Sequence, residues 1–296
     1  MTERSPSPLS GPRERALVLG GGGSAGNAWL IGVVAGLFEA GLDVTDADLI
    51  VGTSAGSTAA AQITGAAPSA LLAEILAAPP APGRGPARPA LTMSHLQRLD
   101  ATIAASTDAA DYRRRMSAVL LADPAPDRSA QWRATVAARF AGRGWPSDSL
   151  LITAVDAKTA EPVLFDRDSG VDIVDAVAAS CAGGFAYRIG EGRYIDGGYR
   201  TNPDNADLAQ GWAKVLVLSP LGGASRTPAA WGLHLADQVE ALRAGGSRVE
   251  TVFPDDTSRE AFGDNLMDPS TRLPAAKAGY DQGRALLARV AEFWLG

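Results

Sequence analysis

A serine in a setting typical of a nucleophile lies near the start of the chain. The stretch GTSAG at residues 52–56 fits the pattern G-x-S-x-G and follows the apolar run 49–51. In this pattern the serine lies on a sharp turn from a strand into a helix, which pushes its hydroxyl outward. Bulky side chains two residues away would collide across that turn, so glycines are needed there. We therefore interpret Ser54 as a nucleophile, the alternative being an ordinary glycine-rich turn.

A second loop could stabilise the negative charge that such a nucleophile creates. The stretch GGGGSAG at residues 20–26 also stands between an apolar run and an expected helix. Glycines let backbone N–H groups approach a bound anion closely. An oxyanion formed by attack of Ser54 is such an anion, and one donor to it contributes about 2.7–4 kcal/mol. We expect the donors to be the N–H groups of Gly22, Gly23 and Ala55.

The same loop allows a second interpretation. Gly21, Gly23 and Gly26 satisfy G-x-G-x-x-G, the dinucleotide-binding pattern. That function requires an acidic residue at the end of the second strand to hold the ribose. The second strand ends in Gly52, Thr53 and Ser54 instead, none of which is acidic, and Asp43 lies before the strand. A nucleotide-binding oxidoreductase is therefore the weaker hypothesis.

The candidate general base is an aspartate rather than a histidine. A serine hydroxyl is a poor nucleophile until a base takes its proton. Asp196 closes a short apolar run and precedes Gly197 and Gly198, which permit a tight turn and a close approach to Ser54. The alternative is an Asx turn without chemistry. His95 and His234 do not end strands, so we expect surface or packing roles for both.

These residues need a scaffold of alternating strands and helices. Apolar runs at 16–19, 49–51, 150–155 and 215–218 predict buried strands, and 163–165, 193–195 and 248–253 predict further ones. Helices are expected at 27–40, 57–64, 172–182 and 273–295. Strand and helix in alternation indicate a parallel sheet covered by helices. The predicted fold is a three-layer α/β/α domain with a central, mostly parallel sheet.

The middle of the chain breaks this alternation. The stretch PPAPGRGPARP at residues 79–89 can hold neither a helix nor a central strand, so it predicts a surface loop. The arginine-rich part that follows reads as helical. We interpret 79–146 as a helical insertion within a single domain at 15–296, preceded by a disordered leader at 1–14.

Composition excludes several classes of protein. The 296 residues carry a net charge of −6, which argues against a nucleic-acid partner. No set of His, Cys and carboxylate residues has metal-ligand spacing, so no metal and no cofactor are expected. Cys181 is the single cysteine, no secretory signal is visible, and we expect a cytoplasmic protein. An apolar patch could still make transient contact with a membrane surface.

Three motifs in order resemble the patatin-like phospholipase family of acyl hydrolases, which use a serine–aspartate dyad. The resemblance implies an oxyanion loop at 21–26, a nucleophile elbow at 52–56 and a base motif at 196–198. It implies a lipid acyl hydrolase of the phospholipase A or lysophospholipase-like esterase type, acting on a lipid or small ester through an acyl-enzyme. The implied site residues are Ser54 and Asp196 as the dyad; Gly21, Gly22, Gly23, Ser24 and Ala55 as the oxyanion hole; and Gly26, Gly52, Gly56, Gly197 and Gly198 as motif glycines.

Two positions depart from the family pattern. Ala25 stands where many members carry Arg or Lys, so the loop lacks a positive charge of its own. Gly183 and Gly184 stand where proline is common, after the segment Ala179–Ala182. The loss of charge at Ala25 supports one alternative, a catalytically silent lipid-binding or scaffold protein of the same fold.

Overall fold

The computed structural model describes residues 14–79, 89–139 and 144–296. Two predictions fall outside these ranges: the leader, apart from Glu14, and the interior of the proline-rich loop at 80–88.

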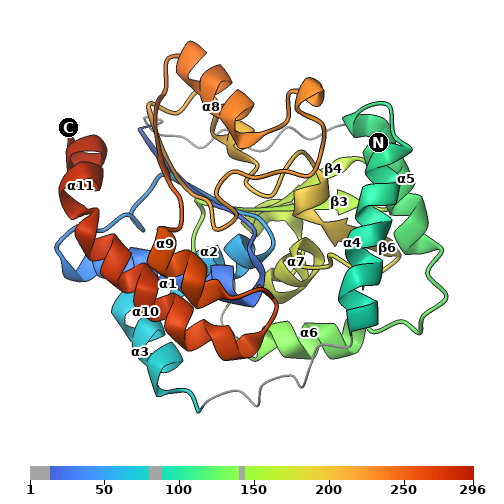
Figure 1. Cartoon of the computed structure of the whole chain (residues 1–296), viewed down its shortest axis with the longest axis horizontal. Helices are drawn as coiled ribbons and strands as arrows, with labels where there is room; N and C mark the ends of the chain where they lie inside the picture. The colour runs from blue at the N-terminus through green and yellow to red at the C-terminus, as the bar shows by residue number, and fades with distance from the viewer. Residues whose placement is uncertain (1–13, 80–88, 140–143) are drawn as a thin grey trace.

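A mixed β-sheet crosses the middle of the molecule (Figure 1). Its strands follow the order β5-β6-β3-β2-β1-β7-β8, and β4 pairs with β3. Their bounds are β1 (Arg15–Leu19), β2 (Leu49–Gly52), β3 (Leu150–Asp156), β4 (Pro162–Phe165), β5 (Tyr187–Ile189), β6 (Gly192–Asp196), β7 (Lys214–Leu218) and β8 (Arg248–Val252). The run from β3 through β2, β1 and β7 to β8 is parallel. The strands β4, β6 and β5 extend it by antiparallel pairing.

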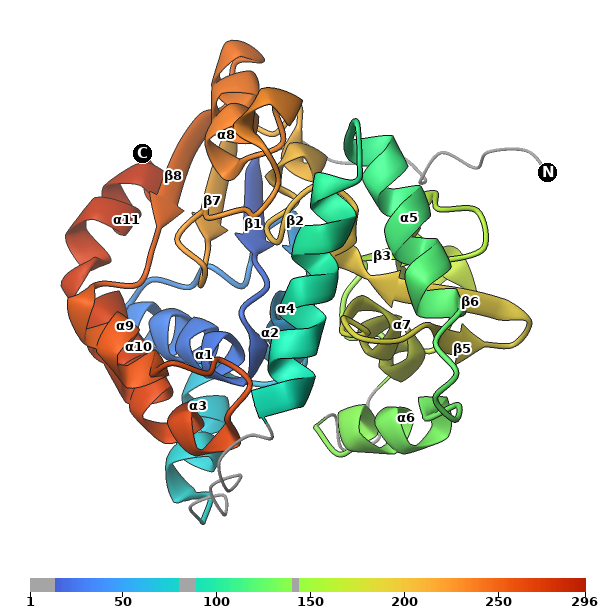
Figure 2. The same cartoon turned by 45° about the vertical axis from the view of Figure 1, so that its right-hand side comes forward.

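Helices cover both faces of the sheet. Their bounds are α1 (Gly23–Glu39), α2 (Ala55–Gly65), α3 (Pro68–Ala77), α4 (Pro89–Ala104), α5 (Ala109–Leu121), α6 (Ser129–Ala137), α7 (Ile173–Ser180), α8 (Leu235–Ala244), α9 (Asp256–Phe262), α10 (Arg272–Ala285) and α11 (Leu287–Leu295). Figure 2 shows α1, α2, α7 and α10 on one side of the sheet and α8 on the other.

Alternation along the strands builds a separate core on each face. In β1, Leu17 and Leu19 pack into the large core with α1, α2, α7 and α10. Ala16 and Val18 point the other way, into a smaller core with Leu235 and Val239 of α8. Successive side chains of a strand point to opposite faces, which is why one short strand serves two cores. The three-layer α/β/α prediction is confirmed, with parallel pairing at the centre of the sheet.

The helix predictions differ from the structure mainly at helix ends. The helix expected at 27–40 begins at Gly23, and the one expected at 57–64 begins at Ala55. The expected closing helix is two helices, α10 and α11. The break between them redirects the chain, so that Val290 and Trp294 of α11 join the large core. Helices α3 and α9 and strand β5 were not predicted.

The register of the sheet brings the predicted dyad together. Gly52 of β2 pairs with Ile152 of β3, and Ser54 follows two residues later. Asp196 pairs with Ala154, which also lies two residues beyond Ile152. Because β6 runs antiparallel to β3, its last residue lies level with the turn that follows β2. This edge of the sheet is crossed by α4, which belongs to the predicted insertion (Figure 2).

Within the described ranges, no single helix has both the length and the apolar character that a membrane span requires. The helices α2 and α3 pass that test only as a pair, and they are bent by 118° at their junction.

Candidate active site

Ser54 occupies the turn between β2 and α2 in a strained backbone conformation. Its φ is 51° and its ψ −118°, on the left-handed side that residues other than glycine rarely adopt. Two side chains at the C-terminal end of α7 hold this turn. The Ser54 N–H donates to Ser180 Oγ (2.9 Å), and Cys181 Sγ donates to the Ser54 carbonyl (3.0 Å). Cys181 therefore binds the elbow rather than only filling space.

The two glycines of the elbow are required by close packing. A Cβ on Gly52 would lie 2.6 Å from Ser57 Cα. A Cβ on Gly56 would collide with the carbonyl oxygen of Leu19 at the end of β1. Glycine at both positions lets α2 start directly against the end of the sheet.

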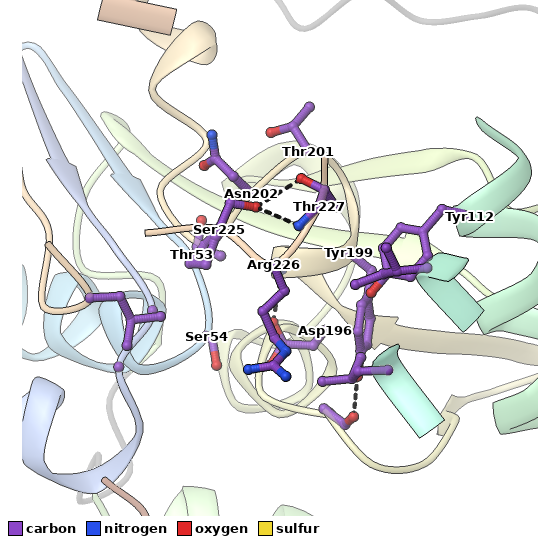
Figure 3. A pocket seen from close by; sticks show the side chains of 18 of the residues that line it. Thr53, Ser54, Tyr112, Asp196, Tyr199, Thr201, Asn202, Ser225, Arg226 and Thr227 are labelled. Atoms are coloured by element: carbon purple, nitrogen blue, oxygen red, sulfur yellow. Dashed lines mark hydrogen bonds between the residues drawn. The ribbon is translucent and has the colours of Figure 1, made fainter. Parts of the chain in front are cut away.

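Asp196 ends β6 and faces Ser54 (Figure 3). One of its oxygens accepts the Gly198 N–H (2.8 Å). Burial raises the pKa of Asp196 to about 6, and the Gly198 N–H and the neighbouring Ser54 hydroxyl counter this only in part. A carboxylate with this pKa is ionised at neutral pH and is a stronger base than an ordinary aspartate.

The glycine loop leads into the N-terminus of α1. Gly22 precedes the helix and Gly23 begins it with a φ of +65°. The N–H groups of Gly22, Gly23 and Ser24 have no acceptor within α1, because they precede the first intrahelical hydrogen bond. The same holds for the Ala55 N–H at the start of α2. Gly21 differs from the other members of the predicted oxyanion hole. Its N–H already donates to the Pro203 carbonyl (2.8 Å), so Gly21 lines the site without a free donor.

A buried polar network joins the elbow to the turn at Asp196. Thr153 of β3 donates to the Thr53 hydroxyl (3.0 Å). Asn205 Nδ2 donates to the same hydroxyl and to the Gly197 carbonyl, both at 3.0 Å. Sequence analysis missed these residues. The signal was Thr153 in an otherwise apolar strand, because a buried hydroxyl needs partners.

Two cavities meet at the dyad and share Ser54, His95, Gly183 and Asp196. The narrow cavity has a volume of about 230 Å³ and an apolar wall that includes Leu99, Ile103, Tyr112, Tyr199 and Leu221 (Figure 3). The wide cavity has a volume of about 730 Å³ and is lined by Trp132, Phe185 and Met267 together with Arg128 and Arg139.

The two histidines have different surroundings. His234 caps the start of α8, where its Nε2 lies 2.7 Å from the Thr227 carbonyl oxygen, and this fits the predicted packing role. His95 of α4 instead lines both cavities, which its sequence setting did not indicate. Its Nδ1 is buried without a hydrogen-bond partner. Burial, and then the neighbouring Arg98, lower its pKa, so the imidazole is neutral at pH 7.

No group of three or more His, Cys, Asp or Glu side chains gathers as a metal site within the part of the chain that the structure describes.

A strained serine on an elbow thus lies beside a carboxylate and next to the first N–H groups of two helices, on an α/β/α fold. The family model described as "Patatin-like phospholipase" matches residues 17–209, more than half of the 296 residues. The chain therefore belongs to the patatin-like phospholipase family, and the resemblance inferred from its motifs is confirmed.

Two solved structures match most of this chain. VipD from Legionella pneumophila has a TM-score of 0.41 and 16% identity, covering 95% of this chain and 68% of VipD. The type III effector protein ExoU has a TM-score of 0.40 and 17% identity, covering 95% of this chain and 54% of ExoU. This chain thus spans about half the length of ExoU. A search of curated proteins found no match.

Proposed function

We propose that this protein is a lipid acyl hydrolase of the phospholipase A or lysophospholipase-like type, with Ser54 as nucleophile and Asp196 as base. The observation that carries the proposal is that the strained Ser54 and Asp196 lie together at the junction of two cavities, where both side chains line both cavities. Membership in the patatin-like phospholipase family supports a lipid substrate.

The proposed reaction proceeds in two displacements. Ser54 Oγ attacks the ester carbonyl carbon while its proton passes to Asp196. The carbonyl oxygen becomes an oxyanion that accepts hydrogen bonds from the N–H groups of Gly22, Gly23, Ser24 and Ala55. Collapse of this intermediate expels the alcohol, which takes the proton back from Asp196. Water then repeats the sequence on the acyl-enzyme and frees the acid and Ser54.

The two cavities suggest how the ester lies in the site. The narrow cavity has the apolar wall that an acyl chain requires, so we place the acyl chain there. The wide cavity then receives the alcohol part of the ester. We propose a lipid or small ester as substrate, transient contact with a membrane surface and a cytoplasmic location.

A fluorophosphonate probe tests the nucleophile. The probe should label wild-type protein on the peptide that contains Ser54, because the elbow exposes an activated hydroxyl. Ser54→Ala should not be labelled, and Asp196→Asn should be labelled more slowly. Absence of label from the folded wild type would favour the silent lipid-binding alternative, and label on another residue would refute the assignment of Ser54.

A further inference from the structure

A partly buried arginine from the C-terminal part of the chain lies directly behind the oxyanion loop. Arg272 begins α10, outside the segment matched by the family model. Its Nη1 donates to the Ser24 carbonyl (3.3 Å) and to Asn27 Oδ1 (2.9 Å), both in the first turns of α1. Asn27 in turn donates through Nδ2 to the Ala55 carbonyl (3.4 Å). The Arg272 guanidinium thus contacts the α1 side of the candidate oxyanion hole directly and the α2 side through Asn27.

Close packing of two helices fixes the place of Arg272. Helices α1 and α10 run side by side in the same direction (Figure 1), and Gly32 and Gly36 of α1 face Gly279 and Gly283 of α10 across their interface. A Cβ at any of the four would collide with backbone of the other helix. The N-terminus of α10 is therefore held against the N-terminus of α1.

The segment that leads into α10 also contacts the loop. The Leu266 carbonyl accepts the Ala25 N–H (3.0 Å). A Cβ on Gly23 would lie 2.7 Å from that carbonyl oxygen and 2.8 Å from Met267 Sδ. The glycine loop therefore lies between β1 on one side and residues 266–272 on the other.

The charge of Arg272 is not compensated by an acid. Among the described residues, no carboxylate forms an ion pair with it. The two oxygens that accept its hydrogen bonds are neutral. Burial, and then the positive charge of Arg139, lower its pKa to about 10, which still leaves it charged at pH 7. Partial removal of a cation from water without a counter-charge is unfavourable.

Two helices add to this positive potential. The N-termini of α1 and α2 both face the site, and neither helix has an acidic residue in its first turn. A helix N-terminus attracts anions and repels cations, so these helix ends and Arg272 together favour an anion at the site. A negative charge that forms between the two helix ends would be stabilised by both.

We propose that Arg272 is a positioning residue for the oxyanion hole, and that its charge stabilises the oxyanion formed during attack by Ser54. It supplies from α10 the positive charge that the loop lacks at Ala25. This inference rests on the proposed function, because it assumes that an oxyanion forms at Ser54.

The test compares Arg272→Gln, Arg272→Lys and the wild type on a soluble p-nitrophenyl ester. As a matched control, Arg289→Gln removes one positive charge from α11, where Arg289 pairs with Glu250 (3.0 Å). Arg272→Gln should lower kcat roughly 10- to 100-fold, somewhat less than loss of a donor that touches the oxyanion. KM should stay within about threefold, because the charge acts on the transition state. Arg272→Lys should keep kcat within about fivefold, and the control should match the wild type.

A trifluoromethyl ketone provides a readout that a structural role alone would not move. Such a ketone adds to the serine and forms a stable oxyanion, so its Ki reports oxyanion stabilisation. The Ki for Arg272→Gln should rise by the same factor as kcat falls, with melting curves confirming the fold. A folded Arg272→Gln with kcat within twofold of the wild type, or with reduced kcat and unchanged Ki, would overturn the proposal.

Two further outcomes keep the test decisive. If Arg272→Gln does not fold, Arg272→Lys decides alone, since a hundredfold loss with the positive charge still present would refute the role of charge. Failure of the proposed function would show in the wild type itself, which would then neither bind the ketone at Ser54 nor hydrolyse the ester. Failure of the present inference shows only in the comparison between variants.

Discussion

At the scale of single residues, the proposed chemistry depends on one carboxylate with a raised pKa. Burial holds the pKa of Asp196 at about 6. In the proposed mechanism a histidine is not needed to accept the proton, because this aspartate is a better base than a solvent-exposed one. The side chain is poised for proton transfer by its surroundings rather than by its type.

The pH dependence of catalysis follows from this pKa. Wild-type kcat/KM should rise with pH through an apparent midpoint near 6 and level off above it, because only ionised Asp196 accepts the Ser54 proton. Asp196→Asn should lower kcat by on the order of 10²–10⁴ and abolish that midpoint. Ester hydrolysis from pH 4.5 to 8.5 measures both. A variant that kept the midpoint near 6 would show that another group titrates.

Stability provides an independent check on Asp196. Its folded-state pKa lies above the unfolded value, so the stability that protonation provides is complete below about pH 4 and is lost as pH rises through about 6. Asp196→Asn should therefore melt no lower than the wild type at pH 8.

His95→Ala and His234→Ala should keep kcat within about threefold, since neither histidine is assigned a proton transfer. A folded histidine variant as inactive as Ser54→Ala would indicate a conventional triad.

At the scale of elements, the dyad is assembled from two turns that belong to different parts of the sheet. The β2–α2 elbow carries Ser54, and the turn after β6 carries Asp196. Asn205 connects them through Thr53 and the Gly197 carbonyl, and its φ of 55° places its amide between the two. One buried amide therefore links the turn of the candidate nucleophile to the turn of the candidate base.

Removing that amide should impair both stability and catalysis. Asn205→Ala loses four side-chain hydrogen bonds, two donated by Nδ2 and two accepted by Oδ1, and should destabilise the fold by about 2–4 kcal/mol. In the folded protein, kcat should fall at least about tenfold, because the alignment of Ser54 with Asp196 loosens. Urea unfolding and ester hydrolysis at a temperature where the variant is folded measure these effects.

Gln238→Leu is the matched control for Asn205→Ala. Gln238 of α8 is also buried and bonds the same turn through the Ala206 N–H (2.9 Å), but it does not contact the elbow. It should lose stability and keep kcat close to the wild-type value. Equal losses of kcat in both variants would show that general loosening, rather than the link through Thr53, controls the dyad.

At the scale of the whole molecule, one buried carboxylate behind the loops at the edge of the sheet reduces stability. Asp204 is fully buried behind Gly20, and its two oxygens lack hydrogen bonds of normal geometry. Burial raises its pKa to about 6, and the Ser219 hydroxyl offsets this only in part. An ionised Asp204 therefore opposes folding at neutral pH.

Asp204→Asn should stabilise the protein in a pH-dependent way. A pKa raised from about 3.8 to about 6 corresponds to about 3 kcal/mol at most, so a gain of about 1–3 kcal/mol is expected at pH 8. The gain should shrink as pH falls from about 6 towards 4, where the wild-type carboxyl is protonated in the folded state. Urea unfolding across this range measures it, with Asp281→Asn on the exposed face of α10 as control. A gain independent of pH would exclude the buried charge as its cause.

The sequence alone determined the family, the fold class and the motifs. Local rules carry this information, because G-x-S-x-G after an apolar run predicts an elbow and alternating strands and helices predict a covered parallel sheet. Membership in the patatin-like phospholipase family and the α/β/α layers agree with those predictions. The roles of Ser54 and Asp196 stay predictions that the proposed experiments test.

Only the tertiary structure decided which distant residues surround these motifs. His95 reaches the dyad because α4 crosses the edge of the sheet, and Asn205 reaches Thr53 because its backbone turns through a left-handed conformation. Arg272 contacts the oxyanion loop because glycines let α10 pack closely along α1. Arg272 and Asn27, which are hydrogen-bonded, are 245 residues apart in sequence. The physical reason is common to all three. Such contacts depend on packing between elements, whereas a sequence pattern records only neighbours along the chain.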